Sequence, residues 1–413
     1  MNKRAMNTRA VNKRAVNICV VNLRTVTKQF AAVVLAICLT PGLSPFTASG
    51  YVLHRTIAAP DPRNNGVPFC PMPNHFDVVS AGTIDRRWDT TLGNNIITLG
   101  AGVSEVDGVI QESFSVWTHV QGTALAVGSL GPLTQVTGGG SCSSGDGVNS
   151  ICFTQPAAFA TGVLAFTQVL AADVVGQQAG AKTASFVGEI LDADLLVNPD
   201  PKNTFATPTV LAGNPGAYDL ESILIHELGH FFGFSHSLVV GAMMYPFAPP
   251  VGSFTGSRPS NGAPDAPLGD DDRAGLRVLY PGGVTFGVIR GRILPVNPLS
   301  LQSFPATSAG HAVTGYYGTH VVAVDADSGQ TIAGTLGGYS CDALMQISIF
   351  DGSYEIGGLP LGHRYKIYVE PLNGPVPPAE VAEPLNTEPC RAGTANNCFP
   401  PALNTNFTTK VRP

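Results

Sequence analysis

Three histidines and a glutamate lie close together near the middle of the chain, in the stretch HELGHFFGFSH. His226 and His230 are four residues apart, and on a helix side chains at this spacing project from one face. His236 follows after a short interval. If the helix ended between His230 and His236, the chain could turn back and bring His236 to the other two histidines. Three histidine nitrogens leave the fourth position of tetrahedral zinc open, which is the arrangement of catalytic zinc sites.

Glu227 and Gly233 complete this pattern. Glu227 follows the first histidine, where it would lie beside the metal and hold a water without being a ligand. Gly233 stands where the helix must stop and reverse, and glycine adopts the left-handed backbone that such a reversal needs. A lone H-x-x-x-H pair on a helix often has no function, but five residues at the required spacing predict metal-assisted hydrolysis with Glu227 as general base.

The helix that must carry these residues is the strongest helix pattern in the chain, DLESILIHELGHFFGF. Asp219 is the expected N-cap. Its apolar face comprises Ile223, Leu224, Leu228, Phe231 and Phe232.

The segments before this helix predict an α+β fold. Strands are expected at NNIITLGAG and ALAVGSL, with a helix between them over residues 106–120. Residues 131–160 are rich in Gly, Ser and Thr and predict a surface loop, and strands are expected over 162–170 and 186–198. A short helix, DDDRAGLRVLY, closes the region, and its acidic start suits the positive end of a helix dipole.

A second region begins after PGG, residues 281–283. Alternating strand patterns separated by D-S-G and D-G turns predict a small β-sandwich over 283–372. Residues 373–413 are rich in proline and predict a tail with little regular structure.

Composition and the N-terminus bear on location and partners. The formal net charge is -6 and there is no basic stripe, which argues against nucleic acid as a partner. Residues 1–50 combine a basic stretch, the short apolar run FAAVVLAICL and small residues, which predicts an export signal rather than a membrane span. We expect the mature, secreted chain to start near Tyr51, and translation could begin later than Met1, for example at Met6.

Six cysteines remain after export, an even number that favours disulfides in an oxidising compartment. Closeness in sequence suggests the pairs Cys142–Cys152 and Cys390–Cys398. Cys70 with Cys341 would follow only by elimination.

The stretch HELGHFFGFSH resembles the H-E-x-x-H-x-x-G-x-x-H signature of the metzincins, zinc endopeptidases that keep a methionine turn beneath the metal. The stretch GAMMYP can be aligned with this methionine turn in two ways. An astacin-type turn would use Met243, with Tyr245 as an extra ligand. The matrixin type, A-L-M-Y-P, maps onto residues 242–246 and is favoured because Met244 lies eight residues after His236.

The matrixin resemblance covers about residues 81–282 and implies a zincin-like catalytic domain, a twisted mixed sheet with an active-site helix. It implies one catalytic zinc ion held by the three histidines. Met244 would form the floor of the site, and Tyr245 and Pro246 would wall the pocket for the residue after the cut, together with the 247–267 loop. The substrate would be a protein or peptide, added as a strand along the edge at 162–170.

Two features of that family are less clear in this chain. Residues 51–80 are a short extension in place of a sizeable pro-domain, and Cys70 could be a reduced switch, although a disulfide is favoured. Structural calcium in the family suggests Asp146, Asp192 and Asp194 as ligands by position.

DGSYEIGGLP and the strands around it resemble the carboxypeptidase regulatory-like, transthyretin-type sandwich. The sequence therefore predicts a secreted, monomeric zinc endopeptidase with no stable membrane span. The alternatives are a secreted adhesive protein with a vestigial metal site and a pappalysin-like metzincin. The presence of Glu227 argues against the first alternative, and Tyr245 followed by Pro246 argues against the second.

Overall fold

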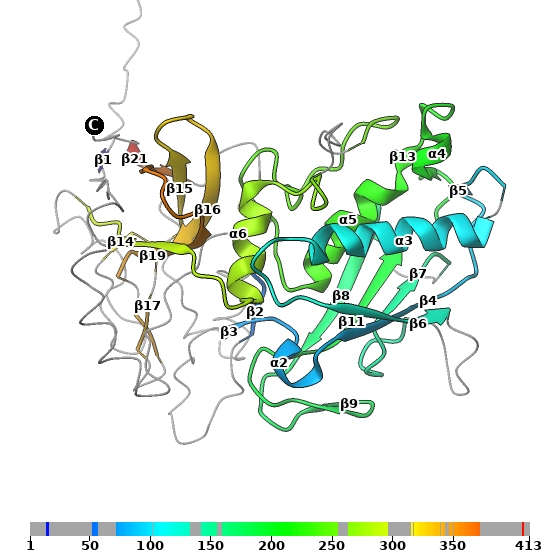
Figure 1. Cartoon of the computed structure of the whole chain (residues 1–413), viewed down its shortest axis with the longest axis horizontal. Helices are drawn as coiled ribbons and strands as arrows, with labels where there is room; N and C mark the ends of the chain where they lie inside the picture. The colour runs from blue at the N-terminus through cyan, green and yellow to red at the C-terminus, as the bar shows by residue number, and fades with distance from the viewer. Residues whose placement is uncertain are drawn as a thin grey trace, which may run out of the picture.

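The computed structural model (Figure 1) describes most of the chain between residues 72 and 371. The described residues are 14–15, 52–56, 72–100, 102–132, 142–154, 159–254, 263–295, 315–316, 318–338, 340–342, 347–349, 351–371 and 407–408. Nearly all of the predicted export signal and of the predicted tail lie outside them, as do Cys70, Cys390 and Cys398. Among the described residues, no helix is long and apolar enough to cross a membrane.

The described chain forms two regions, a larger one before the boundary at residues 281–283 and a smaller one after it. A five-stranded mixed sheet forms the centre of the larger region. Its strands are β4 (Ile84–Trp88), β6 (Val127–Pro132), β7 (Ser150–Cys152), β8 (Ala165–Ala171) and β11 (Ile190–Val197). They lie in the order β6-β4-β7-β11-β8, with β8 antiparallel to β11 and the other pairs parallel. β11 is buried along its whole length because strands flank it on both sides and helices cover it. β8 has one strand neighbour and therefore forms an edge of the sheet.

Two long helices cover one face of this sheet (Figure 1). They are α3 (Gly102–Thr118) and α5 (Leu220–Phe231). The predicted helix over 106–120 is thus confirmed, and its buried residues include the apolar Val106, Val109, Ile110, Phe114 and Trp117. The indole Nε1 of Trp117 donates a hydrogen bond of 2.9 Å to the Ile225 carbonyl, which joins α3 to α5 inside the core.

Short elements surround this framework. They are β2 (Arg55–Thr56), β3 (Met72–Pro73), α2 (Val78–Ala81), β5 (Ile96–Ile97), β9 (Gln178–Ala179), β10 (Lys182–Thr183), β12 (Phe205–Ala206), α4 (Pro208–Leu211) and β13 (Tyr218–Asp219). β2 pairs with β3, so two N-terminal segments lie side by side. Far apart in sequence, β1 (Arg14–Ala15) pairs with β21 (Phe407–Thr408).

The prediction of a surface loop over 131–160 is wrong for its last part. β7 is fully buried and lies between β4 and β11 in the sheet. Its three residues are too few to show a strand pattern, and the Gly- and Ser-rich flank conceals them. The predicted disulfide Cys142–Cys152 is confirmed and joins the loop to this strand.

The smaller region consists of short antiparallel sheets. β14 (Gly287–Arg292) pairs with β19 (Ser353–Leu359), and β17 (Ser340–Asp342) pairs with β18 (Ile347–Ile349). β15 (Thr319–Asp325) lies between β16 (Thr331–Gly337) and β20 (Tyr365–Pro371). The predicted strands are therefore present, whereas their closure into a transthyretin-type sandwich stays a prediction.

The helix α6 (Asp270–Leu279) stands between the two regions (Figure 1). Gly358 of β19 lies against the Ala274 carbonyl so closely that a β-carbon would collide with it. Arg277 donates a 3.1 Å hydrogen bond to the Gly358 carbonyl, and the Gly334 amide of β16 donates one of 2.7 Å to Asp271. The strands of the smaller region are thus packed directly on a helix of the larger one.

Candidate metal centre

The helix α5 starts and ends where its capping residues dictate. Asp219 is its N-cap, as predicted, and its carboxylate accepts hydrogen bonds from the amide and hydroxyl of Ser222 at 2.8 and 2.6 Å. At the other end the chain reverses at Gly233, whose φ is +103°. A β-carbon at Gly233 would collide with the Asn74 carbonyl, so this position excludes larger residues for two reasons, the backbone angle and the contact.

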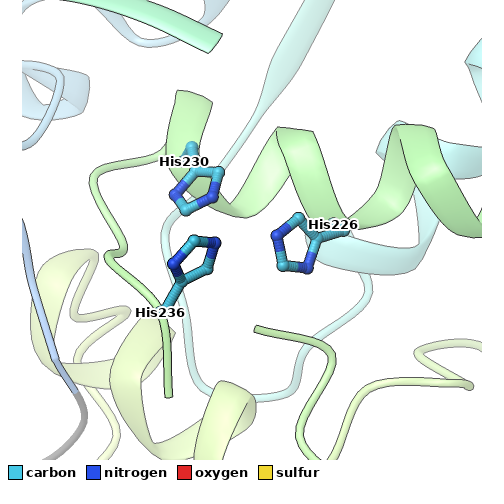
Figure 2. Close-up of side chains that lie close together, drawn as sticks. All are labelled: His226, His230 and His236. Atoms are coloured by element: carbon cyan, nitrogen blue, oxygen red, sulfur yellow. The ribbon is translucent and has the colours of Figure 1, made fainter. Parts of the chain in front are cut away.

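The reversal brings the three histidines together (Figure 2). His226, His230 and His236 each offer a nitrogen within 4.8 Å of the other two. Among the described residues this is the one group of three or more potential ligands that meets this condition. His226 and His230 project from α5, and His236 reaches the same point from the segment after the turn.

Hydrogen bonds fix which ring nitrogen of two of these histidines is available. The Nδ1 atoms of His226 and His230 lie 2.8 Å from the Met243 carbonyl and 2.9 Å from the Phe234 carbonyl. A carbonyl only accepts, so each Nδ1 must carry the proton and each Nε2 is left with a free lone pair.

The surroundings also keep these rings neutral. Burial, and then the neighbouring His236, lowers the pKa of His226 to about 4. Burial likewise lowers the pKa of His230 well below its usual value. Because a metal binds neutral imidazole, the convergence of these two rings with that of His236 fits a zinc ion.

Glu227 is next to the first histidine and is buried, with 6% of its surface exposed. Its Oε2 accepts a 2.8 Å hydrogen bond from the Thr167 hydroxyl, which also lies 3.0 Å from the Glu227 carbonyl. Burial raises the pKa of Glu227 to about 7, against the opposing effect of this hydrogen bond. Sequence reasoning missed Thr167, because its place on β8 opposite Glu227 depends on packing between elements 60 residues apart.

Met243 and Met244, here called the methionine segment, pack against α5. Met244 is 1% exposed, and its sulfur lies against Gly229, where a β-carbon would collide with it. Gly229 lies between the two helical histidines, so Met244 supports the turn of helix that carries them. Met243 is also buried, at 3% exposed.

A buried aspartate holds this segment in place. Asp272 of α6 accepts hydrogen bonds from the amides of Met243 and Met244 at 2.6 and 3.2 Å. The Met244 carbonyl accepts one from the Ser237 amide at 2.7 Å, next to His236. Sequence reasoning assigned the acidic start of this helix to dipole stabilisation alone and missed Asp272.

The remaining predicted site residues lie beside this segment. Tyr245 and Pro246 are partly exposed, and the Tyr245 ring packs edge-on against Phe247 with centroids 5.7 Å apart. The loop that follows is described up to residue 254 and from 263, and the intervening residues lie outside the description.

The three aspartates suggested for calcium do not form a comparable cluster among the described residues. Asp192 and Asp194 are buried on β11, whereas Asp146 is exposed. Burial, followed by repulsion from Asp192 and Asp146, raises the pKa of Asp194 to about 8. Lys182 lies nearby, 2.9 Å from the Leu191 carbonyl, and its charge interacts with Asp192. We therefore assign no calcium site.

Comparison with known proteins finds a similarity that is confined to part of the chain. A sequence profile of the matrixin family matches residues 172–281, which include β11, α5, the methionine segment and α6. The mixed sheet and few helices of the larger region are consistent with a domain of that kind.

A relative is also found among characterised proteins. It is Metalloendoproteinase 1 from Glycine max, 42% identical over 64 residues. The aligned part is 16% of this chain and 17% of the relative, so the chain spans well under two thirds of that protein's length.

Proposed function

We propose that this protein is a zinc-dependent endopeptidase of the matrixin type. The observation that carries the proposal is the convergence of three histidine nitrogens beside a buried glutamate at one end of α5. The matrixin match over 172–281 supports it. The fold class proposed for the larger region is accordingly that of the metzincins.

His226, His230 and His236 would hold the zinc through the nitrogens that converge. Bound zinc would supply Lewis acidity, polarising the scissile carbonyl and acidifying a water. Glu227 takes the proton of the attacking water at its carboxylate and returns it to the leaving amine. The Thr167 hydroxyl keeps that carboxylate oriented through its 2.8 Å hydrogen bond.

The edge of the sheet offers a place for the substrate. An extended peptide would add to β8, where main-chain hydrogen bonds give affinity without demanding a sequence. Thr167 lies on this strand, so the peptide would pass next to Glu227. Tyr245 and Pro246 would then wall the pocket for the residue after the cut.

Export of the protein is part of the same proposal. The basic and then apolar character of residues 1–50 supports a signal peptide. The Cys142–Cys152 disulfide agrees with an oxidising compartment. We propose that the mature chain acts outside the cell as a monomer.

A secreted adhesive protein with a vestigial metal site is the second candidate. The packed strands of the smaller region favour it, since such modules often serve attachment. A decayed site would retain the histidines and lose the general base first, yet Glu227 is present and hydrogen-bonded. A pappalysin-like metzincin is a weaker candidate, because Tyr245 and Pro246 follow the matrixin pattern.

The test is to purify the mature chain, measure bound zinc and assay cleavage of denatured casein by the wild type and by Glu227→Gln. We expect zinc to be retained in both and cleavage to fall by about 10²–10⁴-fold in the variant, the usual contribution of a general base. Glu112→Gln, an exposed position on α3, is the matched control and should cleave normally.

Two outcomes would contradict the proposal in different ways. Bound zinc with no cleavage by the wild type would favour the adhesive protein. Equal cleavage by wild type and Glu227→Gln would show that another group is the base.

A further inference from the structure

The short N-terminal segment 52–56 lies against the turn between the second and third histidines. Leu53 is 2% exposed and forms an antiparallel bridge with Phe234. The Val52 carbonyl accepts a hydrogen bond from the Ser235 amide, and the His54 amide donates one to the Gly233 carbonyl, both 2.9 Å long. This segment therefore pairs, strand-like, with the chain that leads from His230 to His236.

The pairing places a fourth histidine at the candidate metal centre. The ring of His54 lies 5.6 Å from that of His230 between centroids, close to the separations within the group of three, which are 4.8 to 5.4 Å. His54 also interacts electrostatically with His236. It does not join the group of converging ligands, so it lies beside that group and not within it.

Within the part of the chain that the structure describes, the ring of His54 has no hydrogen-bond partner. Its backbone is fixed on both sides, since its carbonyl also accepts a 2.8 Å hydrogen bond from the Asn74 amide. No hydrogen bond to its ring nitrogens is present among the described residues, and neither nitrogen is among the fully buried polar atoms that lack a partner. The residue as a whole is of intermediate burial. A neutral imidazole offers one donor and one acceptor, and no described residue occupies either of them.

His75, the other described histidine of the N-terminal extension, shows the contrasting case. Its Nδ1 lies 3.0 Å from the Phe76 carbonyl, and its ring stacks on Phe186 with centroids 4.6 Å apart. It is a packed residue with no contact to the three histidines, which makes it a suitable control.

The side of the site on which His54 lies follows from its neighbours. Its ring contacts His230 and interacts with His236, whereas the ring of His226 is hydrogen-bonded to the carbonyl of Met243, two residues before Tyr245. In Figure 2 the blue ribbon of the N-terminal residues passes on the His230 and His236 side, away from His226. Tyr245 belongs to the proposed pocket for the residue after the cut. His54 therefore lies on the side of the site formed by His230 and His236.

We infer that His54 is a substrate-binding residue, which hydrogen-bonds the peptide on the N-terminal side of the scissile bond. The inference rests on the proposed endopeptidase function. It adds a residue from outside the matrixin-matched segment, delivered by a strand that also supports the turn at Gly233.

The test uses a peptide that spans a cut mapped in casein. His54→Phe keeps a ring that can pack against His230 but removes both nitrogens, and His54→Gln restores a donor and an acceptor. We expect His54→Phe to lower kcat/KM about tenfold, the effect of losing one ordinary hydrogen bond to substrate. His54→Gln should recover part of it, His75→Phe should resemble the wild type, and bound zinc should be unchanged in all.

Shortened peptides locate the contact. The His54→Phe penalty should disappear when residues before the cut are removed and persist when residues after it are removed. A readout without turnover is the Kd of the full peptide for Glu227→Gln, which should rise about tenfold when His54→Phe is added.

Several results would overturn the inference. One is an equal loss of kcat/KM by His54→Phe on both shortened peptides, and another is loss of zinc from this variant. A third is a gain of activity, which would show that His54 obstructs the site. Normal cleavage by every His54 variant would overturn this inference alone. Absence of cleavage by the wild type would instead refute the proposed function, and this inference with it.

Discussion

At the scale of single residues, the two adjacent methionines have different surroundings. Met244 lies against Gly229 under the histidine-bearing turn, while Met243 supplies the carbonyl that orients His226 through its backbone. Only Met244 therefore contributes to the site through its side chain.

We expect Met244→Ala to lower the free energy of unfolding by about 2–5 kcal/mol, the usual cost of a cavity at a buried position. It should also weaken zinc binding, because α5 loses its support between His226 and His230. Met243→Leu should cost less than about 1.5 kcal/mol. Denaturant unfolding and competition with a chromogenic chelator measure the two quantities.

The opposite ranking would move the chain toward the astacin-type alignment, in which Met243 is the floor of the site. Equal and small effects would show that neither side chain supports the helix.

The residues of the candidate site differ in how well the sequence predicts them. Spacing alone singles out His226, His230, His236 and Glu227, because one helix and one turn relate them. Thr167 and Asp272 cannot be found in this way, since each reaches the site from an element whose position only the folded core determines. A serine, threonine or aspartate within a short pattern carries no sign of the partner that it will meet.

At the scale of elements, α6 carries two buried carboxyl groups toward the site. Asp271 is 2% exposed, and it accepts hydrogen bonds of 2.7 Å from both the Ser237 hydroxyl and the Gly334 amide. Burial, and then the charge of Asp272, raises the pKa of Asp271 to about 7 from 3.8.

This pKa shift makes stability depend on pH. The folded state holds the Asp271 proton more tightly than the unfolded state, so its stabilising contribution is full below pH 3.8 and is lost as the pH rises through about 7. Between these values we expect the wild type to lose stability relative to Asp271→Asn, by at most about 1.4 kcal/mol per pH unit. Denaturant unfolding of both proteins across this range measures the difference.

Asp270→Asn serves as the control, because Asp270 is only partly buried on the same helix. Parallel pH curves for wild type and Asp271→Asn would contradict the expectation.

The elements themselves are unequally predictable. α5 and α3 have long apolar faces, and Asp219 marks a start that the structure confirms. β7 has neither length nor pattern, since its identity as a strand comes from the two neighbours that pair with it. Its detection needs contacts that no local window of sequence contains.

At the scale of the whole molecule, the smaller region is packed onto the helix that holds the methionine segment. Gly358 of β19 has a φ of +66° and lies against the Ala274 carbonyl, whereas Gly362, with a φ of +85°, faces open space. Both glycines have a left-handed backbone, but only Gly358 is in close contact with another element.

Gly358→Ala should therefore destabilise the protein more than Gly362→Ala. The control carries only the cost of the backbone conformation, about 1 kcal/mol, while Gly358→Ala must also push β19 away from α6. We expect a lower free energy of unfolding and faster loss of zinc to a chelator in Gly358→Ala, because α6 positions the methionine segment through Asp272. Equal effects of the two substitutions would show that this contact does not matter.

The central place of β7 also constrains the order of folding. It pairs in parallel with β4, which precedes it, and with β11, which is made about 40 residues later. During synthesis, β4 and β7 alone would expose an unpaired strand edge, and the sheet cannot close until β11 and β8 have emerged. Non-local pairings of this kind fold slowly and leave edges open to aggregation. The first half of the larger region is therefore not an independent folding unit. In a newly made chain the sheet stays unprotected until β11 and α5 have been synthesised.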